Sequence, residues 1–567
     1  MRFFTAAVMY LVSLAMILTG VAERTVWAPA PSKVFSIQLE EPTPYLIIQN
    51  ATLKALAGAP QLKLSGATNN VVIQGRESDI IGWLGSDTYT TLVIDPAKEA
   101  LMPVLTEGVR TGANPVPSDM WRSVDQSDSE LSVALNSADE SAVLITNNGF
   151  DAPPANISLK WLIPFDLTVS NSLLGAGGVI LLGAIIINFW AYYTMRKNRG
   201  PKRRIPKAPQ GPKYRSKRKR SAPARGRRSA KNYAVALTSG ILTVGLLAGC
   251  SPLPSASPSP TATVDPNADP AVLNQDQIKA LVTEVSTITI KADAAKDPRI
   301  LAARFTGPAL EARQAHYILM SKSKAIKPLD PVSDQVISFT LPAASREWPR
   351  TVMVVTNSKK TGKLPQMLVL QQKDPRSLYQ VWYDIDMLPS VKFPTVPAAE
   401  IGAIPVAADS LFLKLAPNTI AQSFGVAIDQ GASSEAASWF DVENDPFYQQ
   451  VSKSQADTIA SLRTAKVTVT HQLANQNVIS LATSDSGALV ALFSTDTYTI
   501  KPAKRKTAVA VEGNEKLLYG KKGSTKGIRT IYGDLLLFYV PGVQSEEKIR
   551  TLGATQVLLS VKDVSAR

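Results

Sequence analysis

Residues 172–193 read SLLGAGGVILLGAIIINFWAYY, and this stretch decides how the chain is organised. A helix of this length is about 33 Å long, which is enough to cross the hydrocarbon layer of a membrane. Trp190, Tyr192 and Tyr193 gather at its end, where amphipathic rings favour the membrane interface. The sequence therefore predicts a transmembrane helix over residues 172–194.

A strongly basic segment follows this helix directly. Residues 196–231 hold 17 lysines and arginines and no acidic residue. Because basic residues beside a span mark its cytoplasmic end, we expect the helix to run from outside to inside. Residues 195–232 are then a basic cytoplasmic loop that contacts the lipids of the inner leaflet, and a cytoplasmic partner for this loop is the alternative.

The net charge of +15 comes from this one segment. Residues 23–171 hold 9 basic and 17 acidic residues, and residues 251–567 hold 34 basic and 29 acidic residues. The basicity therefore does not form a surface spread over the protein, and nucleic acid is not an expected partner.

The cysteine and histidine counts exclude several kinds of site. Cys250 is the only cysteine, so neither an internal disulfide nor a cysteine-based metal site can form. The two histidines, His316 and His471, are too few for a histidine-rich metal site. We therefore expect no metal and no cofactor.

Cys250 ends the run Leu247, Ala248 and Gly249, which closes an apolar stretch over residues 233–250. This is the pattern read by bacterial lipoprotein processing, in which the cysteine sulfur takes a lipid and the chain is cut just before it. The segment is either such a lipoprotein signal with its lipobox or a further transmembrane helix. Both alternatives return the chain to the outside of the cell.

The N-terminal 22 residues form a second ambiguous segment. They are almost continuously apolar after Arg2 and are long enough to span a bilayer. We predict a retained signal anchor, and a cleaved signal peptide is the alternative. With the topology above, the protein resides in the cell membrane, and both folded regions are extracytoplasmic.

The folded regions differ in pattern. Residues 23–171 read as short strands separated by turn residues, which predicts a β-rich, sandwich-like ectodomain. Residues 271–567 repeat one order twice, helices first and strands after, which predicts two α+β units of the cone-like nuclear-transport-factor or cystatin type. The expected helices cover residues 274–295, 308–323, 418–429 and 445–462, and the expected strands cover residues 335–341, 351–356, 366–371, 378–387, 465–473, 478–483, 489–493, 507–511, 535–539 and 555–561.

The whole is a multi-domain membrane protein. Its predicted parts are a signal anchor or signal peptide (1–22), the β-rich ectodomain (23–171), a transmembrane helix (172–194), the basic cytoplasmic loop (195–232), a transmembrane helix or lipoprotein signal (233–250), a Pro/Ser-rich linker (251–270), α+β unit 1 (271–400) and α+β unit 2 (401–567).

Several motifs resemble an uncharacterised family of actinobacterial envelope membrane proteins and lipoproteins with a C-terminal domain of unknown function. They are GRESDIIGWLG at 75–85, FTGPALEAR at 305–313, EWPRTVMVV at 347–355, DPRSLYQV at 374–381 and YGDLLLFYVP at 532–541. The resemblance implies an extracytoplasmic, membrane-bound protein, and members are sometimes labelled glycosyltransferases. It carries over no catalytic residue.

Three residues are weak candidates for a ligand or metal site. Asp384 and Asp386 alternate on one face of a predicted strand, as a carboxylate pair holding a divalent cation would. His471 alternates with apolar residues, which fits either a pocket wall or a hydrogen-bonded core residue. We identify no catalytic residues, because no nucleophile motif or phosphate loop has the required spacing.

These observations favour a non-enzymatic membrane protein or lipoprotein of the cell envelope. Its expected partners are membrane lipids and another envelope component, either a protein or a glycan. The alternative is an extracytoplasmic enzyme or accessory factor in glycan or cell-wall assembly.

Overall fold

The computed structural model describes residues 2–28, 32–198 and 269–564, apart from short gaps at 41, 96–97, 99, 110, 139, 163–166, 359–361, 390, 463–464, 475–476 and 505–506. The chain divides into two compact units. One contains helices α1 (Arg2–Thr25) and α4 (Thr168–Lys197). The other contains residues 30–164 together with residues 264–567.

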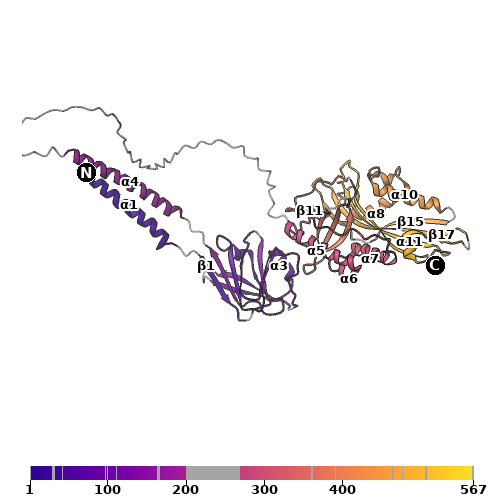
Figure 1. Ribbon diagram of the computed structural model, residues 1–567, viewed down its shortest axis with the longest axis horizontal. Coiled ribbons are helices and arrows are strands. Elements are labelled where there is room, and N and C mark those ends of the chain that lie inside the picture. The colour runs from indigo at the N-terminus through magenta and orange to yellow at the C-terminus, as the bar shows by residue number, and fades with distance from the viewer. Residues whose placement is uncertain are drawn as a thin grey trace, which may run out of the picture. The chain divides into compact units, whose positions relative to one another are not determined.

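Helices α1 and α4 are long and apolar enough to cross a membrane, as predicted for these two segments. They lie side by side (Figure 1). The hydroxyl of Ser13 donates to the carbonyl of Gly177 at 2.8 Å, and the hydroxyl of Ser170 donates to the carbonyl of Gly20 at 2.7 Å. Small side chains let two apolar helices approach this closely.

The buried residues of this pair of helices recur every seven positions in each helix. This spacing places them along one line of each helix, the seam, which contacts the neighbouring helix. They are Ala6, Ser13 and Gly20 in α1, and Ser170, Gly177, Ala184 and Ala191 in α4. The seam explains why the large apolar residues of both helices point away from the pair, where a lipid environment would cover them.

Residues 30–164, which we call the ectodomain after the prediction above, form two sheets that share a core, as the turn-rich pattern predicts. The first sheet has the antiparallel order β1-β10-β3-β8, and the second has the order β6-β5-β2-β9-β4-β7. Leu62 and Leu159 of the first sheet pack with Leu46 and Val72 of the second. The strands are β1 (Ser32–Gln38), β2 (Tyr45–Ile48), β3 (Pro60–Ser65), β4 (Asn70–Arg76), β5 (Tyr89–Asp95), β6 (Ala100–Thr106), β7 (Ser123–Ser127), β8 (Leu131–Ala134), β9 (Ser141–Thr146) and β10 (Asn156–Leu162).

Helix α3 (Glu77–Leu84) covers the outer face of the second sheet. Its Ile80 and Trp83 pack on Ile73 and Leu144 of that sheet, and Trp348 joins this cluster from the C-terminal region. The ectodomain therefore has two apolar faces, and the C-terminal region contacts the one that bears α3.

The C-terminal region begins with α5 (Gln275–Ala295), α6 (Pro298–Leu301) and α7 (Gly307–Lys322). Asn274 and Gln277 form a capping box at the start of α5, which satisfies free amides of its first turn. An antiparallel sheet follows, with the order β11-β12-β13-β14. Its strands are β11 (Val336–Pro342), β12 (Arg350–Asn357), β13 (Gln366–Gln372) and β14 (Gln380–Asp386).

The last part repeats this order of helices and then strands, as the sequence predicts. Its sheet has the order β15-β17-β20-β21, and β16 pairs with β17. Its elements are α8 (Ile420–Gln430), α9 (Glu435–Ser438), α10 (Pro446–Ser461), β15 (Ala465–Leu473), β16 (Ile479–Ala482), β17 (Ala488–Pro502), β18 (Val509–Ala510), α11 (Gly513–Tyr519), β19 (Gly523–Ser524), β20 (Ile528–Val540) and β21 (Arg550–Asp563).

The second of these sheets is buried on both faces. Leu489 and Leu537 pack into a core that also contains α5 and strands β12–β14. Val490 and Phe538, which point the other way, pack against α8 and α10. The two predicted α+β units thus share a hydrophobic core. Their similarity to the cone-like folds of the nuclear-transport-factor or cystatin type stays a prediction.

Strands β17 and β20 are longer than the predicted strands at 489–493 and 535–539. Those predictions cover only the apolar middle of each strand. Beyond it, polar residues continue the antiparallel ladder from Ser494↔Asp534 to Ile500↔Ile528. Backbone hydrogen bonds hold these ends together without an apolar sequence signal.

A buried ion pair joins the ectodomain to the C-terminal region within one compact unit. Nη1 of Arg350 donates to Oδ1 of Asp79 at 2.8 Å, and both side chains are 1% exposed. Nε of Arg76 donates to the other oxygen of Asp79 at 3.1 Å. Such a pair is tolerated away from water only when each charge keeps its partner.

Two further arginines of the C-terminal region reach aspartates of the ectodomain. Arg304 binds both carboxylate oxygens of Asp119, at 2.7 Å and 3.0 Å. Arg376 donates to Asp87 at 2.7 Å and to the carbonyl of Trp83 at 2.9 Å. Arg376 therefore also binds the C-terminal end of α3, where a cation is favourable.

Replacing Asp79 by alanine should leave Arg350 buried without its carboxylate. We expect a loss of about 3–5 kcal/mol in the free energy of unfolding, the usual effect of breaking a buried pair from one side. Denaturant unfolding of the purified full-length protein in detergent measures this loss.

Arg299→Ala is the matched control, because it removes one partner of an exposed pair with Asp297. We expect no resolvable shift of its unfolding midpoint. Equal midpoints for Asp79→Ala and Arg299→Ala would contradict the importance assigned to the buried pair.

Candidate functional site

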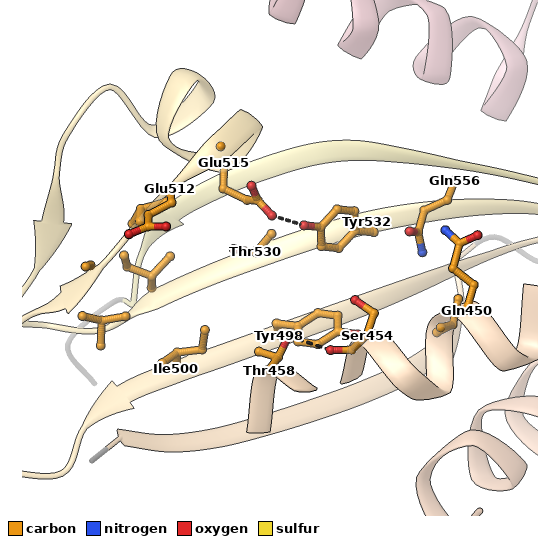
Figure 2. A pocket seen from close by; sticks show the side chains of 16 residues that line it. Gln450, Ser454, Thr458, Tyr498, Ile500, Glu512, Glu515, Thr530, Tyr532 and Gln556 are labelled. Atoms are coloured by element: carbon orange, nitrogen blue, oxygen red, sulfur yellow. Dashed lines mark hydrogen bonds between the residues drawn. The ribbon is translucent and has the colours of Figure 1, made fainter. Parts of the chain in front are cut away.

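A groove of the C-terminal region lies between α10 and the polar ends of β17 and β20, and has a volume of about 540 Å³. Figure 2 shows Gln450, Ser454 and Thr458 of α10 on one side of it, opposite Tyr532 and Glu515. The described residues that line it are Gln450, Val451, Ser454, Thr458, Tyr498, Ile500, Val509, Ala510, Val511, Glu512, Gly513, Glu515, Ile528, Thr530, Tyr532 and Gln556.

Strand alternation carries these side chains into the groove. Tyr498 and Ile500 lie on the same face of β17 as the core residue Leu492, because side chains two positions apart share a face. On β20, Thr530 and Tyr532 occupy the corresponding face and pair with β17. The groove is therefore the continuation of the core face of this sheet beyond its apolar part.

Two tyrosines form its aromatic floor. The rings of Tyr498 and Tyr532 meet edge to face, with centroids 5.9 Å apart. The hydroxyl of Tyr532 donates to Oε1 of Glu515 in α11 (Figure 2). Burial raises the pKa of Tyr532, and Glu515 raises it further, so the phenol remains a hydrogen-bond donor.

A cluster of titratable groups adjoins the groove. It comprises Asp496 of β17 and Asp534 of β20, each two residues from a tyrosine of the groove, together with His471 of β15 and the partly exposed Asp429 of α8. Nδ1 of His471 lies 2.6 Å from Oδ1 of Asp496, and its Nε2 lies 3.3 Å from Oδ1 of Asp429. Gln455 of α10 donates to the same oxygen of Asp429 at 2.7 Å. Gly425 of α8 makes room for the histidine, since a Cβ there would lie 2.3 Å from Cβ of His471.

The charges of this cluster compensate one another. Burial disfavours the imidazolium, but Asp496 and Asp429 outweigh it, so the pKa of His471 is raised. Burial, reinforced by the neighbouring Asp496, raises the pKa of Asp534 well above its usual range. Gln556 hydrogen-bonds to Asp534 and also lines the groove, so it connects the cluster to the groove.

His471 thus faces the interior, as its alternation predicts, and lies in a polar cluster. Its side chain is 4% exposed. No histidine stands among the described residues that line the groove. The imidazole therefore does not line the space in which a ligand would lie.

The other two predicted candidates, Asp384 and Asp386, lie on β14 facing α7. Arg313 donates to Asp384 at 2.9 Å and to Asp293 at 3.0 Å. Burial, together with the nearby Asp384, raises the pKa of Asp386 to about 6. The adjoining cavity has a volume of about 30 Å³, and the guanidinium of Arg313 neutralises Asp384.

The described part of the chain contains no group of three or more histidine, cysteine or acidic side chains placed to hold a metal. The lipobox residues Leu247, Ala248 and Gly249 and the lipidation candidate Cys250 lie outside the described residues.

Sequence reasoning missed Tyr498, Tyr532, Asp496 and Asp534, because they lie beyond the apolar run that defined each strand. The alternation Ser494, Asp496, Tyr498, Ile500 is a strand signal in which the inward positions turn from apolar to polar. Such a change marks the place where a buried face opens into a site.

Comparison with known proteins identifies the C-terminal region. A family model described as a domain of unknown function (DUF8094) matches residues 269–561, which is more than half of the chain. No curated protein matches the chain, and no solved structure matches it. The match includes the groove, the cluster around His471, and Arg304, Arg350 and Arg376, which pair with aspartates of the ectodomain.

The cluster predicts how stability depends on pH. The pKa of His471 is higher in the folded than in the unfolded state, so its stabilisation is complete below about pH 6.5 and is lost as the pH rises through the folded value. The raised pKa of Asp534 acts with the same sign, because the folded state binds more protons. Thermal unfolding between pH 6 and pH 8, roughly the range over which histidine titrates, should show a falling midpoint.

His471→Gln should flatten this slope, whereas His316→Gln, on the exposed side of α7, should leave it unchanged. A slope that is the same in both variants would show that another group carries the pH dependence.

Proposed function

The chain belongs to the family described as a domain of unknown function (DUF8094), and from its geometry we propose that it is a membrane-anchored, extracytoplasmic binding protein of the cell envelope. The observation that carries the proposal is the half-open groove between α10 and the polar ends of β17 and β20. We propose no catalytic role for it.

The chemistry of the groove favours a glycan as ligand. Tyrosine rings offer apolar faces that suit the C–H faces of sugars, and Tyr498 and Tyr532 supply two of them. Amide and carboxylate groups, such as Gln450, Gln556 and Glu512, can form paired hydrogen bonds with neighbouring hydroxyls. An envelope protein is the other class of partner and an outcome of the test below.

In this proposal the pair of helices α1 and α4 is the membrane anchor. The seam of small residues supports a retained α1, because cleavage after residue 22 would leave Gly177 and Ser170 of α4 without their partners. In the proposed topology Arg2 and the basic residues after α4 lie at the cytoplasmic ends of the two helices.

The contact between the ectodomain and the C-terminal region supports the placement of both on the same side of the membrane. Asp79 and Arg350 can pair only if residues 30–164 and 264–567 lie on the same side of the membrane. After α4 the chain must therefore return, and the apolar sequence 233–249 is the segment proposed to do so. Its cysteine would tether the C-terminal region as a lipoprotein.

The alternative is an extracytoplasmic enzyme or accessory factor in glycan or cell-wall assembly. One observation favours it: Asp496 orients the imidazole of His471, as a carboxylate orients a general base. The burial of that imidazole away from the groove favours binding over turnover.

Binding is tested by calorimetric titration of the full-length protein in detergent with neutral oligosaccharides released from the envelope of the producing cell. Tyr498→Ala should weaken binding by about tenfold or more, which corresponds to about 1.4 kcal/mol. Thr499→Ala is the control, because Thr499 points to the other face of the same strand.

Oligosaccharide binding that is equal in Tyr498→Ala and wild type would exclude the groove. If the protein captured an envelope protein and bound no oligosaccharide, the ligand would be a protein and not a glycan. Hydrolysis or transfer of the oligosaccharide would establish the enzymatic alternative.

Processing at the lipobox is tested by an immunoblot of C-terminally tagged protein, wild type beside Cys250→Ala. A wild-type band at somewhat over half the full mass, which becomes full length in the variant, is the expected result. Full-length bands in both would mean that residues 233–250 form a further transmembrane helix.

A further inference from the structure

The surface between the ectodomain and the C-terminal region has the character of a binding interface between two partners. Three aspartates of the ectodomain, Asp79, Asp87 and Asp119, each bind one arginine of the C-terminal region, which is Arg350, Arg376 or Arg304 respectively. Asp79 also binds Arg76 of the ectodomain. The overall charges agree, since residues 23–171 are acidic on balance and residues 251–567 are basic.

We propose that residues 30–164 and 264–567 bind each other independently of the chain that links them, so that they remain one complex when that chain is cut. The proposal does not depend on the ligand of the groove, nor on Cys250 being the place of the cut. It makes the C-terminal region a specific partner for the face of the ectodomain that bears α3.

The contacts that support this are directional as well as charged. Arg304 binds Asp119 through two parallel hydrogen bonds, a geometry that fixes orientation. Gln277 of α5 donates to the carbonyl of Met120 at 2.7 Å. These bonds pair polar groups of the two surfaces that separation would leave without these partners.

The two surfaces also fit closely in shape at Gly82 of α3. A Cβ at this position of α3 would lie 2.7 Å from Cη2 of Trp348, so the tryptophan ring rests directly on the backbone of the helix. The guanidinium of Arg350 lies 3.8 Å from the centroid of the same ring. Only glycine allows this approach, although alanine or leucine would suit a helix better.

The ectodomain also has a core of its own, between its two sheets, to which the C-terminal region contributes no residue. The C-terminal region likewise encloses its own two cores. Each part therefore retains a buried interior when the covalent link is broken, and the interface alone decides whether the parts separate.

The experiment uses the full chain with Cys250→Ala, which prevents native processing, and a site-specific protease sequence inserted between Gln210 and Gly211. The protein is purified in detergent, cut, and passed through gel filtration at about micromolar concentration. We expect the two fragments to elute together. Separate elution of two fragments that keep their circular dichroism would overturn the proposal.

Gly82→Leu tests whether this interface holds the fragments. Leucine favours the helix but collides with Trp348, so dissociation of the cut complex should be faster by about tenfold or more. Arg346→Ala is the matched control, since Arg346 pairs with Glu140 at the exposed rim and its loss should change the rate by less than about threefold. Equal rates in the two variants would contradict the proposed interface.

Discussion

The pairing of Arg350 with Asp79 is the interaction on which the arrangement of the folded regions depends. Both groups are almost completely removed from water, and a charge in that position is costly without a partner. Neither the ectodomain nor the C-terminal region can therefore expose this part of its surface without loss. The two regions form one compact unit because their buried charges lie on opposite sides of one interface.

The same reasoning explains why the candidate site lies elsewhere. Asp79, Asp87 and Asp119 at the interface each bind an arginine, whereas the groove beside α10 is half-open. Behind it, Asp534 and the His471–Asp496 pair are buried, with Gln556 bonded to Asp534 and Asp496 bonded to His471. These bonds lie behind the aromatic floor of Tyr498 and Tyr532, and side chains that are already hydrogen-bonded lose less conformational freedom when a ligand binds.

Much of the fold follows from local sequence patterns. The apolar runs, the turn residues and the helical periodicity identify the two long apolar helices, the β-rich ectodomain and the alternating helices and strands of the C-terminal region. The sequence patterns did not predict the polar ends of β17 and β20, because a ladder of backbone hydrogen bonds leaves no periodic apolar signal in the sequence. The sequence pattern made Asp384 a candidate metal ligand, and it could not show that α7 places Arg313 beside this carboxylate from a distant part of the chain.

The sequence by itself determined where the chain is apolar, where it is basic and which segments become helices and strands, because these properties depend on neighbours a few residues away. The tertiary structure alone decided that GRESDIIGWLG, EWPR and DPRSLY meet at one interface, with Asp79, Arg350 and Arg376 in contact. It also decided that Tyr498 and Tyr532 face a common groove. Contacts between residues hundreds of positions apart depend on how sheets and helices pack, and no local pattern encodes them.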